Sequence, residues 1–327
     1  MTGVAPPQLS VCIPTYNRAF LLKRSLAALA DAVAARGLGG RVEVCVSDNA
    51  STDDTPAVIA AAVDAHPHIR WNVWRNPTNI GGVANIFRVA DGATGVYLSV
   101  TGDDDVVQPD GLSGLVSATE TGAVLLIVNS YAGLGRWVRQ QSIGDGTRRW
   151  FHRWPDVNHR LGVFHASFLG NLVFRRDVYH RHRRNEFMAN AYPHTLVAAA
   201  AMQDNPALFV NLTLYSVDDS ARTWRALQPR YSCYDMALVQ SADGLVGASW
   251  RAVSAAYAPL VRTVPRTVYN GHIDPRAGVR PAELIAAYRR SVMFQIMAVG
   301  LWAAATVCPS SLLGRLLNRR TDRYTEG

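Results

Sequence analysis

The sequence predicts an α/β protein with a mostly parallel sheet that helices cover on both faces. Apolar, strand-like runs alternate with helix-like segments over the first 130 residues. This alternation is typical of parallel strands joined by helical crossovers. Polar clusters directly follow three of the runs, with the sequences PTYNR, SDNAS and GDDD. Because ligands of open parallel sheets bind beyond the carboxyl ends of the strands, the three clusters indicate one shared binding site.

The elements follow from local pattern. The helix expected at 19–37 has Leu and Val at helical spacing and stops at a glycine cluster. A second helix is expected with Thr55 as its N-cap and Pro56 in its first position. A third helix follows a Gly-Gly turn. Runs rich in Val, Ile and Leu are expected as strands at 9–16, 41–48, 69–76, 95–100, 123–130 and 206–217, and a strand followed by a helix start is expected within 167–179.

Charge and cysteine content narrow the classes of function. The 327-residue chain carries a formal net charge of +8, which favours an anionic partner. It shows no helix-turn-helix, zinc-finger or RNP pattern, so we expect no nucleic-acid partner. Its four cysteines are far apart and form no CxxC pair, so a zinc site is not expected. We expect the cysteines to be buried, reduced thiols. No secretory signal opens the sequence, and we expect a cytoplasmic protein.

The acidic segment Asp103–Asp105 follows the apolar run VYLSV directly. Three carboxylates at a buried strand end repel one another, and a cation is the simplest way to hold them together. Mg²⁺ and Mn²⁺ take one or two carboxylates together with substrate phosphate oxygens. The segment therefore predicts a metal-diphosphate site, where the metal acts as a Lewis acid on a departing diphosphate. The alternative is a solvated acidic turn.

Three segments, in this order and spacing, resemble the GT-A glycosyltransferases of family 2. They are LSVCIPTYNRAFLLKRSL, VEVCVSDNASTDDT and NPTNIGGVANIFRVADGATGVYLSVTGDDD. The similarity covers residues 8–120, and it implies the GT-A fold, a nucleotide-diphosphate sugar donor and, usually, inversion at the anomeric carbon. The GDDD segment and a later YPHT are most similar to abequosyltransferase-like members, which transfer deoxysugars.

The resemblance implies a set of site residues. Asp103 and Asp105 match the metal-binding DxD motif and are the expected ligands of Mn²⁺ or Mg²⁺. A second register, in which Gly102 takes the first acidic position, pairs Asp104 with Asp105 instead. Family members often have a second Asp where this chain has Asn49, so base recognition is expected to differ. The residues implied to bind the nucleotide sugar are Pro14, Thr15, Tyr16, Arg18, Asp48, Asn49, Asn79, Gly81, Gly82, Asp103 and Asp104.

An inverting transfer also needs a general base, because the acceptor hydroxyl loses a proton as it attacks. The family uses an Asp, often within an ED pair 80 to 100 residues after the metal motif, and this chain has no such pair there. We predict His194, in NAYPHTLV, because the unperturbed pKa of histidine suits a base. A buried structural histidine is the alternative interpretation. Asp177, Glu186 and Asp204 are the other candidates.

The expected organisation is a GT-A catalytic domain at 1–230, with a nucleotide-sugar half at 8–120 and an acceptor half at 121–230. A helical region at 231–327 follows. Within it, 291–308 is apolar and flanked by arginines. This stretch is expected to pack on the domain or in a homodimer, to lie on the inner face of the membrane as a peripheral contact, or to span it. A sugar-lipid acceptor suits the membrane alternative, and a small-molecule acceptor suits the packed one.

The function expected is therefore metal-dependent glycosyl transfer in cell-envelope polysaccharide or natural-product biosynthesis, such as that of antibiotics. One alternative is a nucleotidyltransferase on a similar sheet. Such enzymes usually carry a Gly-rich, Lys-containing loop after the first strand, which PTYNRAF lacks. The other alternative is a non-catalytic sugar-nucleotide-binding protein.

Overall fold

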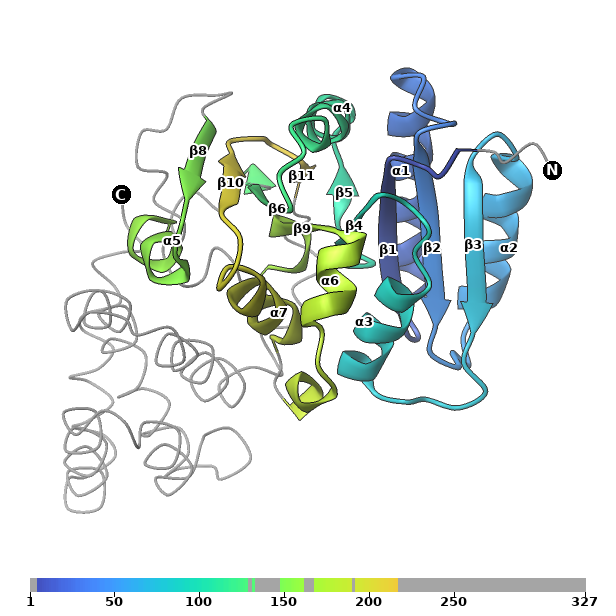
Figure 1. Cartoon of the computed structure of the whole chain (residues 1–327). Helices are drawn as coiled ribbons and strands as arrows, with labels where there is room; N and C mark the ends of the chain where they lie inside the picture. Colours follow the sequence, from blue (N-terminus) through green and yellow to red (C-terminus); the bar gives the residue numbers. More distant parts are fainter. Residues whose placement is uncertain (1–4, 129–130, 133–147, 162–167, 190–191, 217–327) are drawn as a thin grey trace, which may run out of the picture. The chain divides into compact units, whose positions relative to one another are not determined.

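The computed structural model describes residues 5–128, 131–132, 148–161, 168–189 and 192–216 (Figure 1). Strands and helices alternate along the first part of the chain, as the sequence predicted. In order, these elements are β1 (Leu9–Thr15), α1 (Ala19–Ala35), β2 (Val42–Asp48), α2 (Thr55–Ala65), β3 (Arg70–Arg75), α3 (Gly82–Asp91), β4 (Tyr97–Val100), β5 (Val106–Val107) and α4 (Pro109–Thr119).

The second part of the described chain has shorter elements. They are β6 (Leu125–Val128), β7 (Tyr131–Ala132), β8 (Arg148–Phe151), α5 (Trp154–Leu161), the 3-10 helix η2 (Leu169–Asn171), β9 (Leu172–Arg175), α6 (Arg176–His182), the 3-10 helix η3 (Asn185–Ala189), α7 (Pro193–Ala201), β10 (Ala207–Val210) and β11 (Tyr215–Ser216).

The main sheet has eight strands in the order β3-β2-β1-β4-β9-β6-β10-β8. The pairs β3–β2, β2–β1, β1–β4 and β6–β10 are parallel, whereas β9 and β8 run antiparallel to their neighbours. A small second sheet pairs β5, β11 and β7. The predicted α/β class with a mostly parallel sheet is thus confirmed, and β8 and β9 make the sheet mixed.

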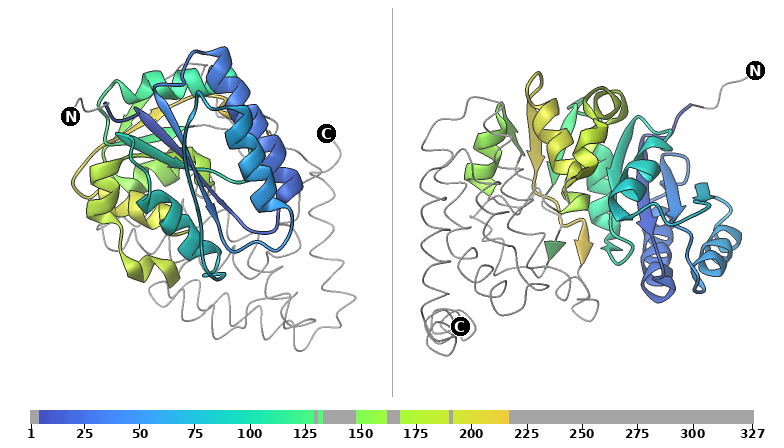
Figure 2. Two further views of the ribbon diagram at one scale, coloured as in Figure 1. Left: turned by 90° about the vertical axis from the view of Figure 1, so that its right-hand side faces the viewer. Right: turned by 90° about the horizontal axis from the view of Figure 1, so that it is seen from below.

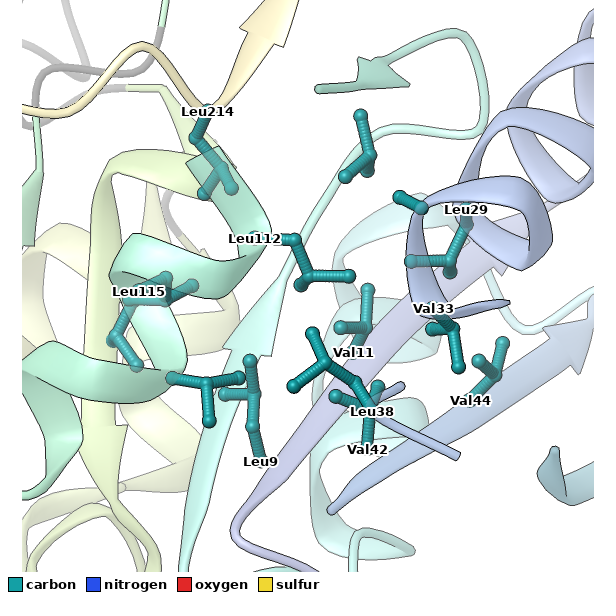
Figure 3. Packing of buried hydrophobic residues seen from close by; sticks show 14 of the residues in the cluster. Leu9, Val11, Leu29, Val33, Leu38, Val42, Val44, Leu112, Leu115 and Leu214 are labelled. Carbon is teal, nitrogen blue, oxygen red and sulfur yellow. The ribbon is translucent and has the colours of Figure 1, made fainter. Parts of the chain in front are cut away.

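Helices cover both faces of the main sheet (Figure 2). Alternate residues of β1 divide between the faces because successive strand side chains point in opposite directions. Leu9, Val11 and Ile13 belong to a core with Leu29 and Val33 of α1, which also includes leucines of α4 (Figure 3). On the other face, α3 packs against β1, β2 and β4, while α6 and α7 pack against β9.

Cys12 and Cys45 lie opposite each other on neighbouring strands, and both are buried free thiols, as predicted. The start of α2 differs from expectation. Asp54 rather than Thr55 takes the N-cap position, and the side chain of Asp53 accepts a hydrogen bond from the Thr55 N–H at 3.1 Å. Asp53 thus satisfies the Thr55 N–H, and the Thr55 hydroxyl accepts the Arg18 N–H at 3.3 Å instead of capping the helix.

The acceptor-half segment at 133–147, the domain boundary at 230 and the apolar stretch at 291–308 lie outside the described residues. Within the described residues, no helix has the length and apolar character needed to cross a bilayer.

Candidate functional site

The carboxyl ends of β1, β2 and β4 lie side by side. Parallel pairing aligns Thr15 with Asp48, so the first two polar clusters leave the sheet at the same edge. Cys12 of β1 pairs with Val100, the last residue of β4, and the Thr101 N–H donates to the Cys12 carbonyl at 2.9 Å. The acidic segment therefore begins within one strand spacing of the β1 end, which confirms the shared edge predicted from sequence.

Arg18 supplies the positive charge that the structure places on the acidic segment. Its guanidinium lies 2.8 Å from Asp103 Oδ1 and 2.7 Å from Asp104 Oδ2. The Thr15 hydroxyl donates to Asp103 Oδ2 at 2.8 Å. Both oxygens of Asp103 are thus bound by residues of the PTYNR segment. The sequence predicted a metal ion in this neutralising role, and the described structure shows that an arginine of the chain shares it.

The side chain of Asp105 folds back onto the residues that precede it. Its Oδ2 accepts hydrogen bonds from the Thr101 hydroxyl and the Gly102 N–H, each at 2.8 Å. A Cβ at position 102 would stand 2.7 Å from Asp104 Oδ1 and 3.0 Å from Asp105 Oδ2. Glycine therefore leaves room for the two carboxylates to fold over the turn. A side chain at position 102 would displace them.

The three aspartates differ in environment. Asp103 is 4% exposed and Asp105 is 9% exposed, whereas the side chain of Asp104 is 24% exposed. Burial raises the pKa of Asp103 to about 6, and the nearby Arg18 charge and the Thr15 hydrogen bond oppose that rise. Asp103 and Asp105 thus form the inner pair of the segment, which favours the Asp103-x-Asp105 register.

Two loops at the ends of β1 and β2 hold each other in place. The Asn17 N–H donates to the Ser51 hydroxyl at 2.9 Å, and the Thr52 N–H donates to Asn17 Oδ1 at 2.7 Å. Asn17 and Ala50 both have left-handed backbone conformations, with φ of 52° and 62°. Such conformations cost free energy in residues other than glycine and persist where surrounding contacts enforce them, commonly in binding loops.

Asp48 is buried at the end of β2. Its Oδ1 accepts the Ser51 N–H at 2.9 Å, and its Oδ2 lies 3.3 Å from Arg75 Nε. A second nitrogen of Arg75 donates to the Ser51 carbonyl at 2.6 Å. The carboxylate implied to contact the base is therefore fixed at the edge of the site by its own loop and by β3.

Asn49 holds the turn that contains Asn79 and Gly81. Its Nδ2 donates to Asn79 Oδ1 at 2.8 Å, while its Oδ1 accepts from the Ile80 N–H at 3.0 Å. Asn79 Oδ1 also accepts the Gly81 N–H at 2.8 Å. Gly81 has a φ of 88°, which only glycine adopts without strain. Asn49, 2% exposed, thus shapes the nucleotide-side turn from within, and its predicted contact with the nucleotide stays a prediction.

The sequence analysis missed the amides that continue this network. Asn76 Nδ2 donates to Asn49 Oδ1 at 3.0 Å and to Asn85 Oδ1 at 2.9 Å. Asn85, from α3, also accepts the Ser47 hydroxyl at 2.6 Å. Isolated asparagines at these positions form no sequence motif. Only the fold shows that they share one hydrogen-bond network.

Tyr215 is a further residue that sequence reasoning missed. It lies in β11, which pairs with β5 directly after the acidic segment. Burial raises the pKa of its hydroxyl, and the charge of nearby Asp105 raises that pKa further. A lone tyrosine late in the chain offers no signal that it lies beside the aspartates.

The remaining nucleotide-site residues occupy the same edge. Tyr16 is 41% exposed, Pro14 is the last residue but one of β1, and Gly82 begins α3. An exposed aromatic ring beside a strand end is available to a flat ligand such as a base. The roles of these residues in nucleotide binding stay predictions.

The donor set fits a divalent cation that a substrate completes. Within the described residues, no three His, Cys, Asp or Glu side chains gather around one point. Asp103 and Asp105 offer two carboxylates, and Mg²⁺ or Mn²⁺ in sites of this kind takes its other ligands from phosphate oxygens and water.

The base candidates lie in the second half. His194 is in the first turn of α7 and is 4% exposed. Asp177 forms an exposed two-pronged pair with Arg175, with distances of 2.7 and 3.0 Å. Glu186 and Asp204 are exposed, with side-chain exposures of 69% and 72%. His194 therefore stays a prediction.

The comparisons with known proteins agree with this geometry. The family description "Glycosyl transferase family 2" matches residues 10–182. Abequosyltransferase RfbV of Salmonella typhimurium is 31% identical over 116 residues, which are 32% of this chain and 30% of that protein. Succinoglycan biosynthesis protein ExoO of Rhizobium meliloti is 31% identical over 124 residues, 38% of this chain and 33% of that protein. The matches thus span about a third of the length of these relatives.

Solved structures show the shared fold. Mannosyltransferase PcManGT from Pyrobaculum calidifontis, in complex with GDP-Man and Mn²⁺, has a TM-score of 0.56 at 18% identity, covering 93% of this chain and 87% of that one. S. aureus TarS 1-349 in complex with UDP-GlcNAc has a TM-score of 0.59 at 16% identity, covering 97% and 89%.

The Asn49 network predicts the effect of restoring an acid there. In Asn49→Asp the side chain keeps its acceptors but can no longer donate to Asn79, so the turn loses an anchor. We expect the free energy of unfolding to fall by about 1–3 kcal/mol, measured by urea denaturation. Asn185→Asp is the matched control, since exposed Asn185 only accepts, from Arg183, and we expect a change within about 0.5 kcal/mol. An Asn49→Asp protein as stable as the control would contradict this role.

Proposed function

The chain belongs to glycosyltransferase family 2, and from that premise we propose that it transfers a sugar from a nucleotide-diphosphate donor to a hydroxyl acceptor, with inversion. The observation that carries the proposal is the contact of Arg18 and Thr15 with buried Asp103. It joins the segment implied to line the nucleotide pocket to the segment implied to hold the metal. Structural neighbours bound to GDP-Man with Mn²⁺ and to UDP-GlcNAc support a donor of this class.

In the proposed reaction, the nucleotide lies along the strand ends, with its base toward Asp48 and Tyr16. Asp103 and Asp105 would hold Mn²⁺ or Mg²⁺. When bound, the metal acts as a Lewis acid that offsets negative charge on the departing diphosphate. Arg18 keeps positive charge beside the same carboxylates, and the Asn49 network keeps the Asn79–Gly81 turn in a fixed position. Fixed dipoles and charges of this kind lower a barrier because they need no rearrangement as charge develops.

The acceptor and the sugar are inferred from the similarity of this chain to named relatives. The names of two curated relatives, abequosyltransferase and succinoglycan biosynthesis protein, favour polysaccharide synthesis, and the first favours a deoxysugar. The acceptor hydroxyl must lose a proton as it attacks, and we assign His194 as the base that takes it.

Calorimetric titration with UDP, GDP, dTDP and CDP, each with and without Mn²⁺, tests the donor class. We expect one nucleotide to bind in a Mn²⁺-dependent manner to the wild-type protein. Asp105→Ala should lose the Mn²⁺ dependence, because one of the two carboxylates is gone. Glu120→Ala, an exposed surface acid paired with Arg41, should bind as the wild type does. If none of the four nucleotides binds, the donor-site proposal is wrong.

His194→Gln tests the base once a donor and an acceptor are found. Loss of the base should lower kcat by ~10²- to 10⁴-fold while the affinity for the nucleotide diphosphate is retained. His180→Gln is the control, because His180 is a more exposed histidine on α6 and should leave kcat unchanged. Unaltered turnover in His194→Gln would make His194 a structural residue.

A further inference from the structure

Arg18 carries a positive charge at the N-terminus of α1. It is the N-cap residue of α1, and the first turn of that helix has no acidic residue. A helix N-terminus carries partial positive charge, so a cation there is disfavoured unless another group compensates it. The compensation comes from a distant part of the chain, through Asp103 and Asp104, which are 85 and 86 positions away.

The geometry of this contact is that of a fork. One guanidinium nitrogen lies 2.8 Å from Asp103 Oδ1 and another lies 2.7 Å from Asp104 Oδ2. Because Thr15 binds Asp103 Oδ2, a divalent cation that approaches Asp103 meets a carboxylate with both oxygens already engaged. Thr15 is a neutral donor, whereas Arg18 brings a full positive charge with its hydrogen bond, so the Arg18 contact is the harder of the two to displace.

Resting on the proposed function, we propose that Arg18 is a built-in counter-cation of the acidic segment, which competes with the divalent metal for Asp103. With Arg18 in place, the segment tolerates its burial without a metal, and the metal alone binds weakly. A nucleotide diphosphate changes this balance, since its negative charge attracts both the metal and the guanidinium. Arg18 thereby makes metal binding depend on the presence of the donor.

The chemistry on the page supports this coupling. The side chain of Arg18 is 30% exposed and lies at the strand ends, where the phosphates of the proposed donor would bind. Arginine binds carboxylates and phosphates with the same planar fork, so exchange of one partner for the other retains its hydrogen-bonding geometry. When the Arg18 guanidinium turns to a phosphate, the carboxylates of the segment repel one another. A divalent cation relieves that repulsion.

The test is Mn²⁺ affinity without nucleotide, measured by calorimetry or by the electron paramagnetic resonance signal of free Mn²⁺. Arg18→Gln should bind Mn²⁺ about tenfold or more tightly than the wild type, because the competing charge is gone. In chelator, the thermal midpoint of Arg18→Gln should be lower than that of the wild type. Addition of Mn²⁺ should raise the midpoint of Arg18→Gln by more than it raises that of the wild type. Arg41→Ala, which breaks an exposed ion pair with Glu120, should match the wild type in both measurements.

Arg18→Lys is a second variant that keeps the test possible if Arg18→Gln does not fold. Lysine keeps the charge but has a single ammonium that cannot bridge both carboxylates, so its Mn²⁺ affinity should fall between the other two proteins. Mn²⁺ affinity that is equal or weaker in Arg18→Lys than in the wild type would overturn the inference.

The nucleotide titration separates this inference from the proposed function. If the wild type binds a nucleotide with Mn²⁺ and the Arg18 variants show no tighter binding of Mn²⁺ alone, only the counter-cation role is wrong. If the variants gain Mn²⁺ affinity and no nucleotide binds the wild type, the counter-cation role holds and the donor assignment fails.

Discussion

The site depends on the neutralisation of carboxylates that the fold buries at the end of β4. Asp103 is 4% exposed, and a buried ionised carboxylate is costly unless it is paired and hydrogen-bonded. Arg18 and Thr15 supply the partners, and both come from the segment that follows β1 or ends it. The contact that offsets the cost of burying Asp103 therefore also fixes the nucleotide-side loop beside the acidic segment.

The sheet makes this contact available. Parallel pairing of β1 with both β2 and β4 brings three loops to one edge, and the antiparallel β9 extends the sheet on the other side of β4. The loops are then held to one another by side chains rather than by the strands. Asn17 binds the loop after β2, and Asn49 binds the turn before α3. The edge is therefore shaped before any ligand arrives, which is the condition for fixed charges to act on a reacting group.

The sequence predicted the strand ends well, because apolar runs followed by polar clusters reflect local burial. It predicted that Asp103 to Asp105 need a cation, since the repulsion is evident from adjacency alone. It did not identify Arg18 as that cation, because the pair is separated by 85 residues and only the β1–β4 register brings it together. Asn85 and Tyr215 were missed for the same reason. The sequence also showed no sign that the Asn49 amide holds the Asn79–Gly81 turn, and its predicted contact with the nucleotide stays a prediction.

The central claim is that Arg18 and Asp103 are energetically coupled in the metal-free protein, and a double-mutant cycle measures this directly. The free energy of unfolding is measured in chelator for the wild type, Arg18→Gln, Asp103→Asn and the double variant. The account predicts a coupling of about 1–3 kcal/mol, with most of the cost of Arg18→Gln absent when Asp103 is already neutral. Effects that add within about 0.5 kcal/mol, as expected for an exposed pair such as Arg41 and Glu120, would contradict it.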